Sequence, residues 1–546
     1  MKSWLWVLWL LLLNAVLQLP WSLHDDFAPL RLVVPAGELV ALLALVSVWP
    51  KVGGRLLAAG WLGLLIIELD RLIGVYLMGQ DPLFYDQLFL VRHLLVLIAD
   101  LWTPWWTASA VGIIATTVLT IVLLSKAVTS LRVLADHRAP LVALVLAAGL
   151  ALLPAGWRPV RWITPELAEN LRRSSIIWRG VRAAPQQSPY LDQDGIVLER
   201  RPDVQLYIVE SYGRLLASNP ETRDDWLLRM DELEGTLGDS GFHAASAWCT
   251  APVSGGRSWL ADGSLLTGIP IHHESVYRHL LDRIEPLPDL VEFFDEQGYR
   301  TVRVAPKDRA RPGIELTNDL RFGQQIASVE LDYRGPPQGW GWIPDQYSLG
   351  HIAESVLDGP PLFLLFHMVS SHVPWQPPPP ILDDWRGLEL LDGAEPPPGM
   401  NLSKQTFYQL RRYRRSEEVR LQRGARDALT VAAYAESIDY DLEVISRHLQ
   451  QVPERDAIIV IMGDHQPPLV GGEATMDVPM HLLSRDPALL APFLDSGFTP
   501  GLAIAPEAEA ALRHEGFFSL LVRSLAQCCS DGPLPAYHPD GTPPHP

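Results

Sequence analysis

The chain has 546 residues, of which 48% are hydrophobic, and a formal net charge of −19. This length exceeds that of one compact domain, and the mean hydropathy of +0.10 exceeds what a soluble enzyme needs. Residues 1–160 hold ten Lys and Arg against nine Asp and Glu, and the remainder holds 34 against 54. Because phosphate contacts need clustered Lys and Arg, so acidic a domain excludes a nucleic-acid-binding protein.

Residues 1–157 are predicted to form a membrane domain of about five helices. A bilayer crossing needs about 20 predominantly apolar residues. Segments of this kind occur at residues 3–19, 31–49, 56–78, 106–124 and 140–157. The apolar-rich stretch 83–102 also contains Asp86, Arg92, His93 and Asp100. We interpret it as an interfacial or re-entrant helix, with a sixth crossing as the alternative.

The short loops between these segments predict the orientation of the chain. The loops on one side contain basic residues, among them Lys51, Arg55 and Lys126, and those on the other contain Asp25, Asp26 and Asp81. The positive-inside rule then places the C-terminal part outside the cytoplasm. Within the third segment Glu68, Asp70 and Arg71 are costly in lipid, so we expect them to pair with one another or to face a polar cavity.

Residues 158–201 are interpreted as an interfacial linker, because Trp and Arg alternate in them; a plain solvated linker is the alternative. Residues 202–530 alternate strand-like and helix-like segments, which predicts an α/β domain with a mostly parallel sheet. The expected strands are residues 204–209, 301–304, 361–369, 457–462 and 478–483, and the expected helices include 287–297, 348–357 and 428–449. Residues 531–546 are expected to form a flexible tail.

Two of the expected strands end in chemically active side chains. One apolar strand runs into Gly463, Asp464 and His465, and another delivers Glu210 at its end. In open α/β sheets the working groups lie beyond the carboxyl ends of the strands, so these residues are candidates for a site. A salt-linked turn is the alternative for the Asp-His pair alone.

A serine follows a glycine pair between these two strands. Gly255 and Gly256 permit a tight turn, and Ser258 then opens an expected helix. The N-terminus of a helix offers free backbone N–H groups that hold a phosphate or sulfate. Ser258 is therefore a candidate nucleophile, although N-cap serines are common and Ser254 is a competing candidate.

This combination resembles the alkaline phosphatase superfamily, in particular its membrane-anchored phosphoglycerol and phosphoethanolamine transferases and enzymes similar to lipoteichoic acid synthase. The resemblance implies a sulfatase-like extracytoplasmic domain behind five membrane helices. It also implies that Glu210, Ser258, Asp464 and His465 bind one divalent metal, Zn²⁺ or Mn²⁺. His372, in the segment SSHVPW, matches the family's phosphoryl-contacting histidine.

The resemblance implies a transferase that moves a phosphoglycerol or phosphoethanolamine group from a phospholipid donor to a glycan or lipid acceptor. Ser258 would carry the phosphoseryl intermediate and His372 would assist, while Arg257, His372 and His481 would bind substrate. For His481 a buried structural role is the alternative. The protein is expected in the inner cell membrane as a multi-pass protein with a periplasmic catalytic domain. The headgroup and the acceptor stay open.

Two other functions are weighed against this one. A sulfatase-like hydrolase, acting on phosphodiesters or sulfate esters, would use water as acceptor. A formylglycine sulfatase is disfavoured, because Cys249 is followed by Thr250, Ala251 and Pro252, which puts the proline one place late. A catalytically inactive sensor or scaffold is the third alternative. The chain's cysteines are Cys249, Cys528 and Cys529, and one bridge from Cys249 is possible.

Overall fold

The structure is a computed structural model. It describes residues 2–23, 31–32, 34–39, 41–42, 50–78, 83–87, 161–183, 196–281, 287–309, 320–340, 343–397, 400–414, 429–452, 454–468 and 475–542. The predicted crossings at 106–124 and 140–157, part of the segment 31–49 and most of the segment 83–102 lie outside these residues. The chain divides into two compact units, Met1–Arg179 and Gly180–Pro546, and each is described by itself.

The first unit is built on helices α1 (Lys2–Leu23), α3 (Pro50–Met78) and α7 (Thr164–Ala183). Helices α1 and α3 occur where two membrane segments are predicted, and Leu17 of α1 and Trp61 of α3 belong to one apolar cluster. Within the part of the chain that the structure describes, no helix has both the length and the apolar content required to cross a membrane. The membrane domain therefore stays a prediction.

The charged residues of α3 find their partners in later segments. Arg161 donates to Glu68 at 2.8 and 2.9 Å, and Arg71 pairs with Glu166. Gln87 donates to Asp70 at 2.6 Å. The expectation that Glu68, Asp70 and Arg71 pair with one another is thus wrong, since the folded chain supplies distant partners. Asp70 and Arg71 do line a cavity of about 310 Å³, which agrees with the alternative expectation.

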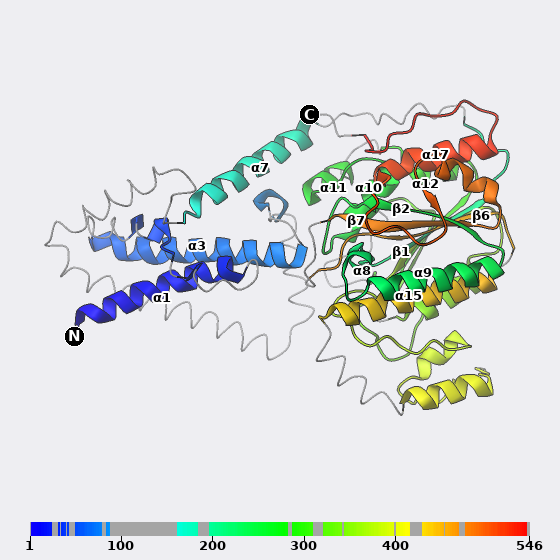
Figure 1. Cartoon of the computed structure of the whole chain (residues 1–546), viewed down its shortest axis with the longest axis horizontal. Coiled ribbons are helices and arrows are strands. Elements are labelled where there is room, and N and C mark those ends of the chain that lie inside the picture. Colours follow the sequence, from blue (N-terminus) through cyan, green and yellow to red (C-terminus); the bar gives the residue numbers. More distant parts are fainter. Residues whose placement is uncertain are drawn as a thin grey trace. The chain divides into compact units, whose positions relative to one another are not determined.

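The second unit contains a nine-stranded mixed sheet (Figure 1). Its strands are β1 (Asp203–Val209), β2 (His243–Thr250), β3 (Arg300–Ala305), β4 (Gln324–Ala327), β5 (Leu362–Met368), β6 (Ala457–Gly463), β7 (Asp477–Ser484), β8 (Thr499–Pro500) and β9 (Leu512–Arg513). The order is β4-β3-β5-β1-β6-β7-β2-β8, with β9 beside β2. Neighbours from β4 to β6 are parallel, whereas β7 is antiparallel to both β6 and β2.

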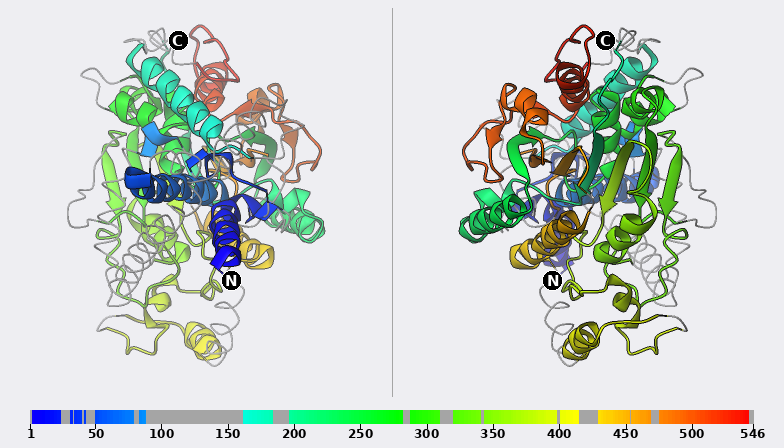
Figure 2. Two further views of the ribbon diagram at one scale, coloured as in Figure 1. Left: turned by 90° about the vertical axis from the view of Figure 1, so that its left-hand side faces the viewer. Right: turned by 90° about the vertical axis from the view of Figure 1, so that its right-hand side faces the viewer.

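Helices cover both faces of this sheet (Figures 1 and 2). One layer includes α8 (Leu215–Ser218), α9 (Arg223–Asp239), α13 (Asp345–Ser355) and α15 (Val431–Gln451). The other includes α10 (Ser258–Thr267), α11 (Glu274–Leu281), α12 (Leu290–Glu296), α16 (Ala491–Leu494) and α17 (Gly516–Cys529). Alternate residues of a strand enter opposite cores, as Tyr207 and Ile208 of β1 do. All of β1 and β6 is buried, which explains their continuous apolar runs.

The five expected strands are confirmed as β1, β3, β5, β6 and β7, and the expected helices as α12, α13 and α15, with shifted ends. The sheet is mixed, with five parallel and three antiparallel pairings among the described strands, so the expectation of a mostly parallel sheet holds except where β7 and β8 pair. Strand β2, with the sequence HAASAWCT, was not expected, because it lacks the β-branched residues that predict strands. Its pairing with β7 along the whole strand fixes it. Cys249, Cys528 and Cys529 are all free, so the possible bridge is absent.

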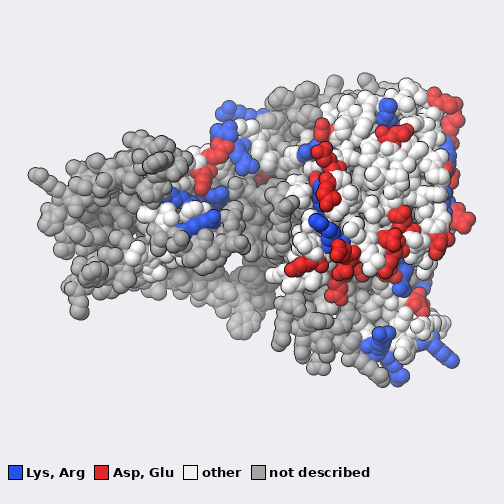
Figure 3. All heavy atoms as spheres, viewed as in Figure 1, with Lys and Arg blue, Asp and Glu red and all other residues white. Residues whose placement is uncertain are grey.

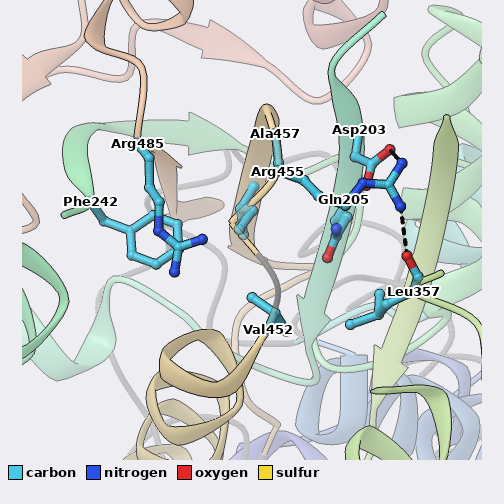
Figure 4. A pocket seen from close by; sticks show the side chains of 9 residues that line it. Asp203, Gln205, Phe242, Leu357, Val452, Arg455, Ala457 and Arg485 are labelled. Atoms are coloured by element: carbon cyan, nitrogen blue, oxygen red, sulfur yellow. Dashed lines mark hydrogen bonds and ion pairs between the residues drawn. The ribbon is translucent and has the colours of Figure 1, made fainter. Parts of the chain in front are cut away.

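A small pocket lies at the amino edge of the parallel strands (Figure 4). Arg455 spans it, donating to the carbonyl of Leu357 at 2.7 Å and to Asp203 at 3.3 Å. Its volume of about 20 Å³ holds about one water molecule. Asp203 is the first residue of β1, and Glu210 follows the last. From the rise per residue of a strand, the pocket is therefore roughly 20 Å from the predicted site.

Candidate active site

Strand register brings the predicted site residues together at the carboxyl edge of the sheet. Val209, the last residue of β1, lies opposite Gly463 of β6 and Met368 of β5. The residues that follow these three strands therefore emerge side by side. They are Glu210 after β1, Asp464 and His465 after β6, and Val369 to His372 after β5.

The turn after β1 has a strained backbone that other elements hold in place. Ser211 has a φ of 62°, which is rare for a residue with a side chain. Its N–H donates to Oδ1 of Asp464 at 2.8 Å, and the Tyr434 hydroxyl donates to its carbonyl at 2.8 Å. A Cβ on Gly463 would lie 1.9 Å from the carbonyl oxygen of Tyr212, so only glycine fits there. Strain of about 1–3 kcal/mol of this kind is concentrated at functional sites.

Ser258 begins α10 after residues whose φ angles are positive. These angles are 67° at Gly255, 139° at Gly256 and 68° at Arg257. The turn buries the Ser258 side chain and places its hydroxyl 3.2 Å from Oε2 of Glu210 and 3.5 Å from Nε2 of His465. The candidate nucleophile thus lies among the candidate metal ligands. The structure places Arg257 directly before the helix, with a partly buried side chain.

Glu210, Asp464 and His465 form a buried group whose ligand atoms all lie within 4.8 Å of one another. Nδ1 of His465 lies 2.9 Å from the carbonyl oxygen of Gln466, which can only accept, so this nitrogen carries the hydrogen. Nε2 then faces Oε1 of Glu210 at 3.3 Å and Oδ2 of Asp464 at 3.4 Å. Oδ2 of Asp464 is buried and accepts no hydrogen bond from a described donor. Two carboxylates, an oriented imidazole and an adjacent hydroxyl fit a divalent cation such as Zn²⁺ or Mn²⁺.

Lys307 belongs to the site although the sequence analysis did not name it. Its Nζ lies 3.6 Å from Oε2 of Glu210. Burial disfavours its charge, but Glu210 and Asp262 outweigh burial and raise the pKa of Lys307. Lys307 follows β3, which ends at the same edge of the sheet as β1. Its position just after an expected strand is the sequence feature that could have indicated a site residue. The order of the strands decides which strand ends meet, and the sequence does not reveal that order.

The site holds opposite charges at close range. Burial opposes ionisation of Glu210, yet Lys307, His372 and His465 keep its pKa well below the ordinary value. Burial likewise opposes the charge on His465, but Asp464 and Glu210 raise its pKa to about 9. The two carboxylates thus favour positive charge within this buried group.

His372 lies next to this group. Its Nδ1 is 2.5 Å from the carbonyl oxygen of Val373, and its ring stacks on Trp340 with 4.8 Å between centroids. Burial lowers its pKa, with Glu210 acting in the opposite direction. The ring is therefore neutral near pH 7, and its Nε2 carries no hydrogen and is an acceptor.

His481 is not brought to the group. It lies on β7, fully buried, with Nδ1 2.8 Å from the Ser246 hydroxyl and Nε2 3.1 Å from the Tyr212 hydroxyl. Burial lowers its pKa to about 3. Both nitrogens have partners, so the position matches a buried structural histidine and not the expected substrate contact.

No family model matches the chain, and no curated protein matches it at a significant level. Solved structures do. The C-terminal periplasmic domain of EcEptC from Escherichia coli is 14% identical, with a TM-score of 0.37, over 64% of this chain and 86% of that chain. The phosphoglycerol transferase GacH of Streptococcus pyogenes, in complex with sn-glycerol-1-phosphate, is 13% identical, with a TM-score of 0.36, over 64% and 78%.

The lipoteichoic acid synthase LtaP from Listeria monocytogenes is 14% identical, with a TM-score of 0.35, over 56% of this chain and 71% of that chain. At such identities and scores, the function has to be argued from the geometry of the site itself.

Proposed function

We propose that the protein is a membrane-bound, metal-dependent transferase. It moves a phosphoglycerol or phosphoethanolamine group from a phospholipid to an extracytoplasmic glycan or lipid acceptor. The observation that carries this proposal is the position of the Ser258 hydroxyl. It lies at the start of a helix and within 3.5 Å of Glu210 and His465.

Glu210, Ser258, Asp464 and His465 would hold one divalent cation, Zn²⁺ or Mn²⁺. When bound, the cation would lower the pKa of the Ser258 hydroxyl and neutralise charge on the phosphoryl group. The chain adds cationic and dipolar groups of its own. Lys307 is a partly buried cation beside Glu210, and the first turn of α10 would offer backbone N–H groups to an anion.

The transfer has two halves. Oγ of Ser258 attacks the phosphorus, the Oγ–P bond forms and the bond from phosphorus to the diacylglycerol oxygen breaks. The Ser258 proton ends on the departing diacylglycerol. In the second half an acceptor hydroxyl attacks the phosphoserine, and its proton ends on Oγ. His372 suits this second half, because its neutral Nε2 can accept the proton of the incoming hydroxyl.

The apolar residues 1–157 would present the lipid donor, and residues 202–530 would hold the site on the periplasmic side, with 158–201 as the interfacial linker. Arg257, next to Ser258, would bind a phosphoryl oxygen. Nucleic acid is not a proposed partner. On the face of the molecule drawn in Figure 3, Asp and Glu are spread over the surface and Lys and Arg form only small groups.

The test uses the purified full-length chain with Zn²⁺ or Mn²⁺ and headgroup-labelled phosphatidylglycerol or phosphatidylethanolamine. Release of diacylglycerol together with transfer of the label to a glycan or lipid acceptor supports the proposal. Release of the label into water, whether or not an acceptor is present, instead indicates the hydrolase. Lipids that stay intact under all these conditions would refute the transferase and any hydrolase that acts on these lipids.

A further inference from the structure

The turn after β5 is fastened to the start of α13 by one buried carboxylate. The N–H of Val369 lies 2.9 Å from Oδ2 of Asp345, and the N–H of Ser370 lies 2.6 Å from the same oxygen. The N–H of Asp345 donates in return to the Ser370 hydroxyl at 3.2 Å. Asp345 is fully buried, so water does not compete for these bonds. Its carboxylate therefore fixes the path of the chain as it leaves the sheet.

The same turn reaches the candidate site through two residues. The Ser371 hydroxyl donates to the backbone carbonyl of Glu210 at 2.7 Å. The N–H of His372 donates to the carbonyl of Val369 at 3.1 Å, which closes the turn. Asp345 thus holds the turn that contacts the candidate metal ligand Glu210 and contains the candidate base His372.

A second buried carboxyl lies behind Asp345. Asp441 of α15 is fully buried, and burial together with Asp345 raises its pKa well above the ordinary value. Ser371 and Tyr440 are its other polar neighbours. Two adjacent buried carboxyls do not both ionise. Asp345 accepts from backbone N–H groups and suits the anion, so the shared proton belongs on Asp441.

We propose that Asp345, through its bonds to the turn after β5, is a positioning residue for the transfer reaction. It holds the turn of residues 369–372 so that His372 and Glu210 face the phosphoryl group. Neither carboxyl touches substrate. The inference rests on the proposed function for its effect on turnover, but the position of the turn can be measured without substrate.

This arrangement predicts that the two carboxyls respond differently to the same change. In Asp441→Asn, an uncharged amide replaces the uncharged acid near Asp345 and the backbone bonds of Asp345 are untouched, so the turn is kept. In Asp345→Asn, the amide keeps only one acceptor oxygen. Its NH₂ group would face a backbone N–H, donor against donor, so part of the support of the turn is lost. Misplaced site groups of this kind cost about 10- to 100-fold in rate.

The experiment compares Asp345→Asn and Asp441→Asn in the full-length, metal-loaded protein. Asp289→Asn is the matched control, because Asp289 is another buried aspartate that accepts a backbone N–H, that of Glu292 at 2.9 Å, at the start of α12. We expect kcat to fall about 10- to 100-fold in Asp345→Asn with KM and bound metal within about twofold. We expect Asp441→Asn and Asp289→Asn to stay within about threefold of the wild-type kcat.

Amide hydrogen exchange at residues 369–372 reads the turn directly. Faster exchange at these residues in Asp345→Asn, but not in Asp441→Asn or Asp289→Asn, supports the inference. A wild type that turns over no lipid would refute the proposed function and leave this result valid. Equal behaviour of the two variants, or unchanged exchange in Asp345→Asn, overturns the inference. If Asp345→Asn does not fold, Ser371→Ala removes the link to Glu210 and decides the question by the same fall in kcat.

Discussion

The hydroxyl of Ser258 lies 3.2 Å from Oε2 of Glu210, although the two residues are 48 positions apart in the chain. The end of β1 delivers the carboxylate and the start of α10 delivers the hydroxyl. Both are buried, so the contact excludes water from a group that is proposed to become a nucleophile. This contact also indicates which serine to replace first.

Ser258→Ala should abolish turnover of labelled lipid, because it removes the hydroxyl that lies within 3.5 Å of both Glu210 and His465. Loss of a nucleophile reduces kcat by at least about 10³-fold in comparable enzymes. Ser254→Ala, four residues earlier in the same loop, is the control and should stay within about threefold of the wild type. Mass spectrometry of the quenched wild type should find a phosphoryl group on the peptide that contains Ser258. A Ser258→Ala variant that still turns lipid over would assign the nucleophile elsewhere.

Metal removal should inactivate and destabilise the protein, because Glu210 and Asp464 are buried carboxylates in one group. At a free metal concentration of about 100 Kd, binding adds about 2.7 kcal/mol to the free energy of unfolding. Chemical denaturation with and without chelator measures this difference. Glu210→Gln and Asp464→Asn should remove the metal-dependent increment, while Asp289→Asn should keep it. An increment of the same size in all three variants would contradict the ligand assignment.

Lys307→Met should lower kcat by about 100-fold, which is the usual cost of losing one donor to developing charge. Lys307→Arg keeps the positive charge and should recover a large part of the rate. Because the charge of Lys307 lies 3.6 Å from Glu210 and helps to lower its pKa, loss of the lysine should also raise the pKa of Glu210 from its depressed value. Steady-state kinetics and metal content are the measurements. A normal kcat in Lys307→Met would show that Lys307 only balances the charge of Glu210 and does not assist the reaction.

Acid should destabilise the second unit through its buried histidines. Burial lowers the pKa of His448 to about 4 and that of His481 to about 3, below the value of about 6.5 in an unfolded chain. Between about pH 6.5 and pH 4 the unfolded chain binds more protons, so the free energy of unfolding falls as the pH falls. Each histidine contributes up to about 1.4 kcal/mol per pH unit.

His448→Gln tests this dependence, because His448 lies on α15, away from the candidate site, with Nε2 3.2 Å from the Tyr207 hydroxyl. The variant should be less steep in its pH dependence between pH 6.5 and 4, whatever its stability at pH 7. Urea denaturation at several pH values gives the slope. An unchanged slope would mean that His448 keeps an ordinary pKa in the folded protein.

Strands β1 and β6 and the turn before Ser258 could be predicted from the amino-acid sequence, because each has a local sequence pattern. Strands β1 and β6 are rich in apolar and β-branched residues, which predicted both strands and the polar residues at their ends. The pair Gly255 and Gly256 predicted the turn before Ser258, because positive φ angles favour glycine. From these signals, Glu210, Ser258, Asp464 and His465 could be named as candidates.

The other residues near the candidate site are selected by strand order and register, which appear only in the folded chain. Lys307 and Asp345 follow or face strands that become neighbours of β1 through the order β3-β5-β1, which no local pattern encodes. His481 was expected in the site, but β7 runs antiparallel to β6 and turns its ring towards Tyr212 and Ser246. Strand β2 was not expected, since its pairing with β7 and not its own composition makes it a strand. Local propensity fixes elements, whereas strand order and register fix which side chains meet.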